Sequence, residues 1–321
     1  MEKNSNSIAV FGGGAWGTSL AITIAQNIAQ VQMYIRNTQL VEQINHNNTS
    51  NTKLGQIVLP KNITATDQID NIQSTSIGII AVPTQSLDQL FQKIKSTNKI
   101  RNFVICSKGI DNRTLKLPSQ ICKEFFPNQG IAILSGPNFA NEIACNKISK
   151  TIIASNNEQL LIKLKLILST NYFKIEMSKD IMGIEICGAV KNVIAIGMGI
   201  ARGLELGENF ISALLVFSLH EIENIVKLFG GNKQTIYSLA GLGDLLLTSY
   251  SLTSRNTNFG FHIAKDKEKL DLNNTLVEGY YTAKSIYKIT KSLGIKMPLC
   301  HYVYNVLYNN KKINDILELI Q

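Results

Sequence analysis

The residue best suited to chemistry is Lys191, which lies within the apolar and small-residue segment 186–199 (ICGAVKNVIAIGMG). Burial of an ammonium group without a partner is costly, so we expect this lysine to face a cleft. Desolvation there lowers the pKa of the amine and suits it to proton transfer. Asn192 follows and could orient a bound hydroxyl or carbonyl group. The structural alternative is a buried lysine paired with an acid such as Glu185.

A second lysine and a glycine–proline turn each follow an apolar run that predicts a strand. Lys108 comes directly after the run FVICS, and the string SGPNFA begins at Ser135, after the run IAIL. Residues at the carboxyl ends of parallel strands face the ligand crevice of such sheets. The Gly136-Pro137 pair predicts a turn, and Asn138 is placed to cap the next helix. For Lys108, an ordinary turn lysine is the alternative.

One carboxylate and one arginine complete the set of candidates. Asp244 lies in AGLGDL, between glycines and a leucine run, where it could bind a substrate hydroxyl, pair with Lys191 or cap a helix. Ser254 is placed to cap another helix, which would bring Arg255 together with the free N–H groups of that helix start. Such a combination suits a phosphate group. A solvated loop arginine is the alternative.

A glycine-rich turn near the start of the chain predicts a dinucleotide site. The string GGGAWG begins at Gly12, after the predicted strand 7–11 and before the predicted helix 18–28. Its first glycine would allow a tight turn, Gly14 would let the backbone approach a pyrophosphate, and Gly17 would let the helix pack on the strand. The helix start would then offer N–H groups to the phosphates. A plain glycine turn is the alternative.

The end of the second predicted strand, 31–35, favours NADPH over NADH. Proteins that bind NAD usually carry an acid there for the ribose hydroxyls. This chain has Arg36 and Asn37 instead, and its next acid is Glu42. An arginine can pair with the 2′-phosphate of NADPH, although a solvated surface role is the alternative. The only tryptophan, Trp16, either covers the pyrophosphate or fills the seam between helix and loop.

Composition narrows the class of protein. The chain has 321 residues, of which 45% are hydrophobic and 17% charged, so we expect about two globular domains. Five cysteines without a CxxC pair and four histidines without a ligand pair predict neither a disulfide framework nor a metal site. The net charge of +9 favours an anionic partner, which could be nucleic acid, anionic lipid or a phosphorylated metabolite. Because the charge is dispersed and forms no basic tail, nucleic acid is not expected.

Two further expectations concern location. The first residues are polar and carry no signal peptide. The longest apolar runs are broken by Lys191, Asn192 or Ser218, so no run is expected to span a membrane. A cytoplasmic protein without membrane insertion is therefore predicted.

The hydrophobic pattern changes about halfway along the chain. Strands alternate with helices in the first part, which predicts an α/β domain with a mostly parallel sheet over residues 1–178. Helical periods dominate afterwards and predict an all-α domain over residues 179–321. The predicted strands are 7–11, 31–35, 77–82, 103–107, 131–134, 151–154 and 172–175. The predicted helices are 18–28, 39–44, 85–94, 158–168, 181–201, 210–228, 235–247, 277–293 and 298–308.

These groups suit one reaction, in which NAD(P)H passes a hydride to a carbonyl and a lysine protonates the resulting alkoxide. A serine nucleophile is unsupported, because no GxSxG string occurs. A dehydrogenase of hydroxy acids is an alternative, but it needs further cations for a carboxylate. A non-catalytic NADPH sensor is another, but it would not require Lys191, Asp244 and Arg255 together.

The motifs GGGAWGTSLA, SKG, SGPNFANEI, CGAVKNVIAIG, AGLGDLLLTSYSLTSRN and VEGYYTAK follow one another between Ile8 and Tyr308. In this order they closely resemble bacterial NAD(P)-dependent glycerol-3-phosphate dehydrogenase. The resemblance implies a Rossmann-type N-terminal domain and an all-helical C-terminal domain. It also implies reversible reduction of dihydroxyacetone phosphate to sn-glycerol 3-phosphate, which supplies phospholipid synthesis, with NADPH as cofactor and NADH possible. The resemblance also implies a homodimer.

The resemblance also assigns roles, motif by motif, and implies no metal. Lys191 becomes the general acid and base. The implied substrate-binding residues are Lys108, Gly136, Asn138, Lys191, Asn192, Asp244, Ser254, Arg255 and Asn256. The implied cofactor-binding residues are Gly12, Gly14, Ala15, Trp16, Gly17, Arg36, Lys108, Ala140, Arg255, Leu276 and Glu278. Three positions depart from the family: Asn138 stands where many members carry Thr or Ser, Ala15 replaces a serine of some members, and Leu276 replaces a valine.

Overall fold

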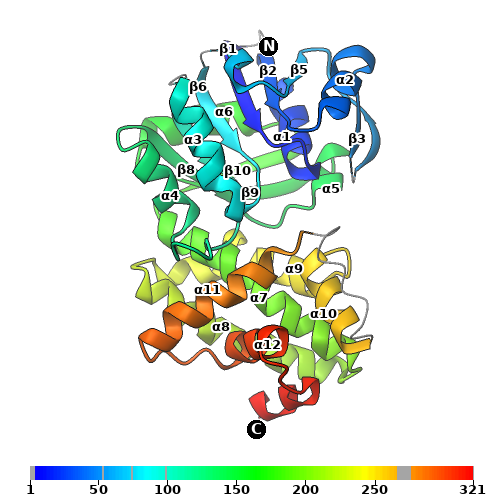
Figure 1. Cartoon of the computed structure of the whole chain (residues 1–321), viewed down its shortest axis with the longest axis vertical. Helices are drawn as coiled ribbons and strands as arrows, with labels where there is room; N and C mark the ends of the chain where they lie inside the picture. Colours follow the sequence, from blue (N-terminus) through cyan, green and yellow to red (C-terminus); the bar gives the residue numbers. More distant parts are fainter. Residues whose placement is uncertain (1–3, 53, 74, 98–99, 266–275, 321) are drawn as a thin grey trace. The chain divides into compact units, whose positions relative to one another are not determined.

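The computed structural model describes residues 4–52, 54–73, 75–97, 100–265 and 276–320 (Figure 1). The chain divides into two compact units. Unit 1 comprises Met1–Ser107 and Ser119–Ile181, and unit 2 comprises Lys108–Pro118 and Met182–Gln321. The segment Lys108–Pro118, which the sequence placed in the first domain, thus belongs to the second unit.

Unit 1 is built on an eight-stranded sheet with the order β10-β9-β8-β7-β6-β1-β2-β5. The strands from β8 to β5 are parallel, whereas β9 pairs antiparallel with β8 and parallel with β10. The predicted mostly parallel sheet is therefore confirmed. The strands are β1 (Asn4–Phe11), β2 (Ile28–Tyr34), β5 (Ile63–Thr66), β6 (Thr75–Ile80), β7 (Ile100–Ile105), β8 (Gly130–Ser135), β9 (Ser149–Ala154) and β10 (Phe173–Ser178).

Helices pack on this sheet over a continuous apolar core. Its centre includes Ile8 and Val10 of β1, Leu20 of the first helix and Val31 of β2, all fully buried. The helices are α1 (Ala15–Ala25), α2 (Thr38–Asn47), α3 (Leu87–Thr97), α4 (Pro118–Phe125), α5 (Ala140–Ala144) and α6 (Glu158–Leu168), with 3₁₀ turns η1 (Ile69–Asn71) and η2 (Thr84–Ser86).

Several short elements of unit 1 escaped the sequence analysis. They are the antiparallel hairpin of β3 (Thr49–Thr52) and β4 (Gly55–Val58), the edge strand β5, and helices α4 and α5. Segments such as TSNT and ITAT hold four residues of mostly polar or small type, so they carry no clear hydrophobic period. Neighbouring strands and helices, not local pattern, decide their conformation.

Unit 2 is helical throughout its described elements. Helix α7 (Ile181–Gly203) is almost wholly buried and the others pack around it. The others are α8 (Gly207–Leu228), η3 (Lys233–Tyr237), η4 (Leu239–Gly243), α9 (Asp244–Tyr250), α10 (Arg255–Lys265), α11 (Glu278–Ser292), α12 (Pro298–Tyr308) and η5 (Ile313–Ile320). The single helix expected at 235–247 is wrong, because a 3₁₀ turn and a π turn precede α9 there.

One helix among the described residues, α7, is longer and more apolar than the sequence analysis expected, although Lys191 and Asn192 interrupt it. This helix has 23 residues and passes the test of length and hydropathy for a membrane span. However, 89% of its most apolar window is buried inside the structure. Because a core helix of a globular unit passes the same test, the burial identifies α7 as the packing centre of unit 2.

Candidate active site

The glycine-rich turn of unit 1 has the geometry that its sequence predicts. Gly12 has φ +123°, and a Cβ there would lie 2.5 Å from Ala81 O. A Cβ at Gly17 would lie 2.1 Å from Gly12 O, so the start of α1 packs closely on the turn. Beside Gly14 there is open space, and α1 begins there without a side-chain cap. The first N–H groups of α1 are thus available to an anion.

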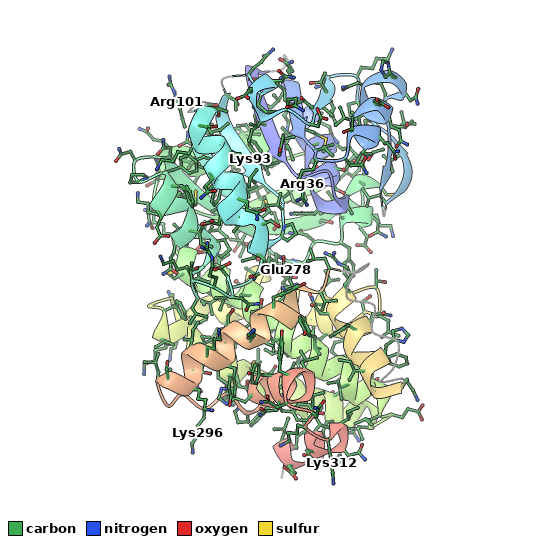
Figure 2. All side chains as sticks on the ribbon, viewed as in Figure 1. Arg36, Lys93, Arg101, Glu278, Lys296 and Lys312 are labelled. Carbon is green, nitrogen blue, oxygen red and sulfur yellow. The ribbon has the colours of Figure 1, made fainter. Side chains whose placement is uncertain are left out.

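The hydroxyl group of Ser19 connects residues next to this turn. Ser19 Oγ lies 2.9 Å from Ala15 O and 2.7 Å from Ala140 O, which links the start of α1 to the start of α5. Trp16 is partly buried and packs against the core of unit 1. Arg36 is exposed just beyond β2, where Figure 2 labels it.

The SGPN turn differs from its prediction at one residue. Asn138 does not cap α5, whose cap position is Phe139 and has no side-chain hydrogen bond. Instead, Asn138 Nδ2 donates to Thr151 Oγ1 at 2.8 Å. Gly136 has φ +148°, which only glycine adopts readily. The turn is therefore held by a contact to β9, a strand whose involvement no local sequence pattern indicated.

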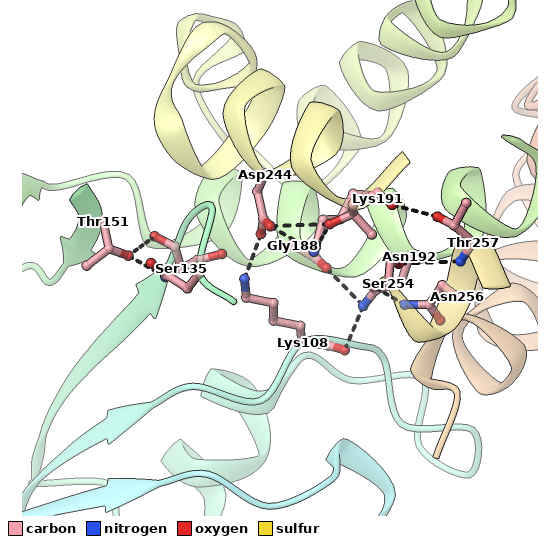
Figure 3. A network of polar contacts seen from close by, with 12 residues as sticks. Lys108, Ser135, Thr151, Gly188, Lys191, Asn192, Asp244, Ser254, Asn256 and Thr257 are labelled. Atoms are coloured by element: carbon pink, nitrogen blue, oxygen red, sulfur yellow. Dashed lines mark hydrogen bonds and ion pairs between the residues drawn. The ribbon is translucent and has the colours of Figure 1, made fainter. Parts of the chain in front are cut away.

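In unit 2, two lysines converge on one buried carboxylate (Figure 3). Lys191 Nζ, from the middle of α7, donates to Asp244 Oδ1 at 2.8 Å, and Lys108 Nζ donates to Asp244 Oδ2 at 2.6 Å. Asp244 is the first residue of α9 and is 2% exposed. The pairing of Lys191 with Asp244 that the sequence allowed is thus observed, and Lys108 is no ordinary turn lysine.

A fourth member of this cluster was missed by the sequence analysis. Lys191 Nζ also donates to Thr248 Oγ1 at 2.6 Å, and this hydroxyl lies 3.4 Å from Asp244 Oδ1. Thr248 follows Asp244 by four residues on α9, so both side chains lie on one helix face. The four-residue spacing between Asp244 and Thr248 was the one pattern in the sequence that indicated this contact.

The electrostatics of the cluster tune Lys191. Burial is the largest cause that lowers the pKa of Lys191, the charges of Lys108 and Arg255 lower it too, and Asp244 raises it; together they bring the pKa from 10.5 to about 8. The amine is therefore protonated at neutral pH but gives up its proton little above it. This is the behaviour expected of a group that both donates and accepts protons.

Amide side chains connect the cluster to the neighbouring helices. Asn256 Nδ2 donates to Asn192 Oδ1 at 2.9 Å, and Asn256 Oδ1 accepts from Gly279 N at 2.9 Å. Asn192 Nδ2 faces Lys108 O at 3.4 Å. The amides thus join α7, α10 and the start of α11 to the turn that carries Lys108, and they fix the positions of both lysines.

The start of α10 has the predicted cap. Ser254 Oγ accepts from Thr257 N at 3.3 Å, which confirms its capping role. Arg255, the first residue of α10, is exposed. Partial desolvation lowers the pKa of its guanidinium, while the negative charge of Glu278 at the start of α11 raises it. Figure 2 labels Glu278, and Leu276 lies half-buried just before that helix.

Two family models cover most of the chain. The model described as NAD-dependent glycerol-3-phosphate dehydrogenase N-terminus matches residues 7–161, and the corresponding C-terminus model matches residues 180–318. The chain belongs to the NAD-dependent glycerol-3-phosphate dehydrogenase family.

Relatives of this dehydrogenase family match over the full length. Glycerol-3-phosphate dehydrogenase [NAD(P)+] of Wolbachia pipientis wMel is 38% identical, over 98% of this chain and 99% of its own. The enzyme of Halothermothrix orenii is 36% identical, over 97% of this chain and 93% of its own. The crystal structure of glycerol-3-phosphate dehydrogenase from Coxiella burnetii is 29% identical and superposes with a TM-score of 0.93, covering 99% of each chain.

A more distant neighbour shares the fold alone. The structure of a probable 2-dehydropantoate 2-reductase from Bacillus subtilis is 11% identical, with a TM-score of 0.62 over 95% of this chain and 100% of its own. Among the described residues, no group of three or more His, Cys, Asp or Glu side chains is placed to hold a metal ion.

Proposed function

We propose that this protein reduces dihydroxyacetone phosphate to sn-glycerol 3-phosphate with NAD(P)H, and catalyses the reverse reaction. The observation that carries the proposal is the Lys108–Asp244–Lys191 cluster of unit 2, found in a member of the glycerol-3-phosphate dehydrogenase family. A buried lysine that titrates near neutral pH suits transfer of a proton to a carbonyl oxygen.

The residues of unit 1 fit a dinucleotide. The uncapped start of α1 offers N–H groups, and Gly14 leaves open space where a pyrophosphate would lie. The cofactor supplies the hydride. Arg36 would pair with the 2′-phosphate of NADPH, which favours NADPH while NADH remains usable. The proposed cofactor contacts are Gly12, Gly14, Ala15, Trp16, Gly17, Arg36, Lys108, Ala140, Arg255, Leu276 and Glu278.

Each residue of the cluster has a distinct task. Lys191 donates its proton to the substrate oxygen as the carbonyl is reduced. Lys108 adds positive charge, and Asp244 holds both amines in place. Thr248 accepts from Lys191 and fixes its direction. The positive charge near Lys191 also favours a dianionic substrate over a neutral one.

The substrate phosphate is assigned to the start of α10. Arg255 supplies a guanidinium, and the first N–H groups of a helix that Ser254 caps bind anions well. Asn192 and Asn256 hold this helix start beside α7. In unit 1, Gly136 and Asn138 of the SGPN turn are the proposed substrate contacts. In this scheme most cofactor contacts come from unit 1, and unit 2 supplies the proton.

We also infer a cytoplasmic homodimer that supplies glycerol phosphate for phospholipid synthesis, without insertion into the membrane. The resemblance to the bacterial enzymes supports this, as does the burial of α7 within unit 2. Light scattering should give twice the chain mass of 35.5 kDa. A solution mass of one chain would contradict the dimer.

The decisive experiment follows loss of the nicotinamide absorbance with dihydroxyacetone phosphate, using NADPH and NADH in parallel. Rapid oxidation is expected, faster with NADPH. A panel of keto acids should give little turnover, since the site offers a phosphate-binding helix start and few extra cations. No turnover with dihydroxyacetone phosphate, in protein that binds NADPH, would contradict the proposal.

Lys191→Ala tests the catalytic assignment within the same assay. Loss of a positioned acid should lower turnover by about 10²–10⁴-fold. Lys288→Ala on the exposed side of α11 is the matched control, and it should retain turnover within about twofold. Near-normal turnover of Lys191→Ala would remove the proton transfer from this residue.

A further inference from the structure

An amide of unit 1 is held in one orientation by a buried threonine. Because β9 runs antiparallel to β8, the beginning of β9 lies beside the carboxyl end of β8. This places Thr151 against the SGPN turn, and a Cβ at Gly136 would lie 2.8 Å from Thr151 Oγ1. Thr151 is fully buried, and Figure 3 shows its side chain beside Ser135.

The hydrogen bonds of the Thr151 hydroxyl determine which end of the Asn138 amide faces it. Thr151 Oγ1 lies 2.8 Å from Ser135 O, a carbonyl that can only accept. The single proton of the hydroxyl is therefore given to Ser135 O. Thr151 Oγ1 can then only accept from Asn138, so the amide must present Nδ2 to it, at 2.8 Å. The reverse orientation would oppose two acceptors.

This arrangement leaves the other end of the amide without a donor. Asn138 Oδ1 is buried and has no hydrogen-bond partner in the described part of the chain. An acceptor in that state destabilises the folded chain relative to a satisfied one. The residue as a whole is only half-buried and follows the carboxyl end of a strand, which is where ligands bind in such sheets. A ligand donor would remove this destabilisation.

We propose that Thr151 is a positioning residue that turns the Asn138 carbonyl oxygen toward the free hydroxyl group of the substrate. The inference rests on the proposed function, because it takes Asn138 as a substrate contact. A hydroxyl or small side chain at position 138 would not need Thr151. The asparagine does, since an unfixed amide presents either a donor or an acceptor. Thr151 thus makes the site selective for a substrate that donates a hydrogen bond.

The test compares two substrates in one preparation of each variant. Dihydroxyacetone phosphate carries the free hydroxyl, and hydroxyacetone phosphate lacks it. The measured quantity is the ratio of their kcat/KM values, which does not depend on the fraction of folded protein. The variants are Thr151→Val, which removes only the hydroxyl, Thr151→Ser, which keeps it, and Asn138→Leu, which removes the acceptor at a half-buried residue.

Thr75→Val is the matched control. Thr75 is likewise buried in the sheet, at the amino end of β6. Its hydroxyl donates to the backbone oxygen of Ser7 in β1. Thr75→Val should lower the melting temperature as Thr151→Val does, but it should leave the ratio of the two kcat/KM values unchanged.

We expect Thr151→Val and Asn138→Leu to lower the preference for dihydroxyacetone phosphate about 3–10-fold, the effect of one hydrogen bond. The change should appear in KM for that substrate, with kcat and KM for NADPH held within about twofold. Thr151→Ser should restore the ratio. An unchanged ratio in Thr151→Val, or a rise confined to KM for NADPH, would overturn the inference. Wild-type protein that fails to reduce dihydroxyacetone phosphate would overturn the proposed function itself, before any variant is compared.

Discussion

At the residue scale, Lys191 shows how burial and pairing combine to set reactivity. Burial in α7 removes water from the amine, and this is the largest cause of the lowering of its pKa to about 8. Asp244 raises the same pKa, yet it also holds Lys108, so its charge is shared between two cations. Desolvation therefore prevails, and the proton of Lys191 is weakly held near neutral pH.

The pH dependence of the two directions should be opposite. Reduction needs protonated Lys191, so its kcat/KM should fall as pH rises through about 8, whereas oxidation of glycerol phosphate should rise. Because Asp244 raises the pKa of Lys191, Asp244→Asn should move the midpoint of the remaining activity to lower pH. Initial rates across a pH series measure both. A midpoint that stays in place in Asp244→Asn would contradict the coupling.

At the element scale, close contact between α7 and α10 positions the catalytic groups. A Cβ at Gly260 of α10 would lie 2.0 Å from Ile196 O of α7, and one at Gly199 of α7 would lie 2.0 Å from Thr257 O. Glycines on both helices thus allow the backbones to meet. Asn192 and Asn256 can form their hydrogen bond only because the helices lie this near.

Gly260→Ala should therefore weaken both stability and catalysis. The added methyl group must push α10 from α7, at a cost of about 1–3 kcal/mol. Arg255 moves with α10, so KM for dihydroxyacetone phosphate should rise as well. Urea denaturation and steady-state kinetics measure the two effects. The control is His262→Ala, at an exposed position of the same helix, which should change stability by less than about 0.5 kcal/mol. Equal stability of the two variants would argue against close helix contact.

A second feature at the element scale is the buried carboxylate of Glu221, which lies against the start of α12. Glu221 of α8 accepts from Leu299 N and Cys300 N, two of the free N–H groups of that helix. Burial raises the pKa of Glu221 to about 7, although these N–H groups and the Cys300 thiol lower it. The anion and the helix start attract each other, but desolvation outweighs that attraction.

Stability should report this titration. The pKa of Glu221 is higher in the folded than in the unfolded chain, so the group stabilises the fold below about pH 4.5, and this contribution is lost as pH rises through about 7. The melting temperature of the wild type should fall, between about pH 5 and about pH 8, several degrees more than that of Glu221→Gln. Calorimetry at matched ionic strength measures the difference. Parallel curves for the two proteins would show that Glu221 does not titrate in this range.

At the scale of the whole molecule, two separate hydrophobic cores stabilise the fold without disulfide bonds. The core of unit 1 surrounds the sheet, and that of unit 2 surrounds α7. All five cysteines are free in the structure. Four of them are buried, and Cys145 alone is exposed.

Thiol labelling should distinguish these cysteines. In the native protein, one thiol per chain should react quickly with an aromatic disulfide reagent, and five should react after denaturation. Cys145→Ser should abolish the fast phase, while Cys106→Ser, at a buried position, should leave it intact. More than one fast thiol in the wild type would contradict the packing of the two cores.

The sequence by itself determined the chemistry that this protein carries and much of its secondary structure. The glycine turn, the buried lysine and the cap at Ser254 are short-range patterns, because a turn, a desolvated segment and a helix start each depend on residues close in the chain. The helix predicted at 158–168 coincides with α6 for the same reason. The alternation of strands and helices likewise indicated the parallel sheet.

Tertiary structure decided which residues meet. Lys108 and Lys191 lie 136 and 53 positions from Asp244, and no local pattern specifies that both bind one carboxylate. The contact of Asn138 with Thr151 depends on the antiparallel pairing of β9 with β8. Hydrophobic periodicity does not indicate the direction in which a strand runs. The short strands β3 and β5 form because neighbours supply their hydrogen bonds. These features arise from packing between distant segments, so only the folded chain contains them.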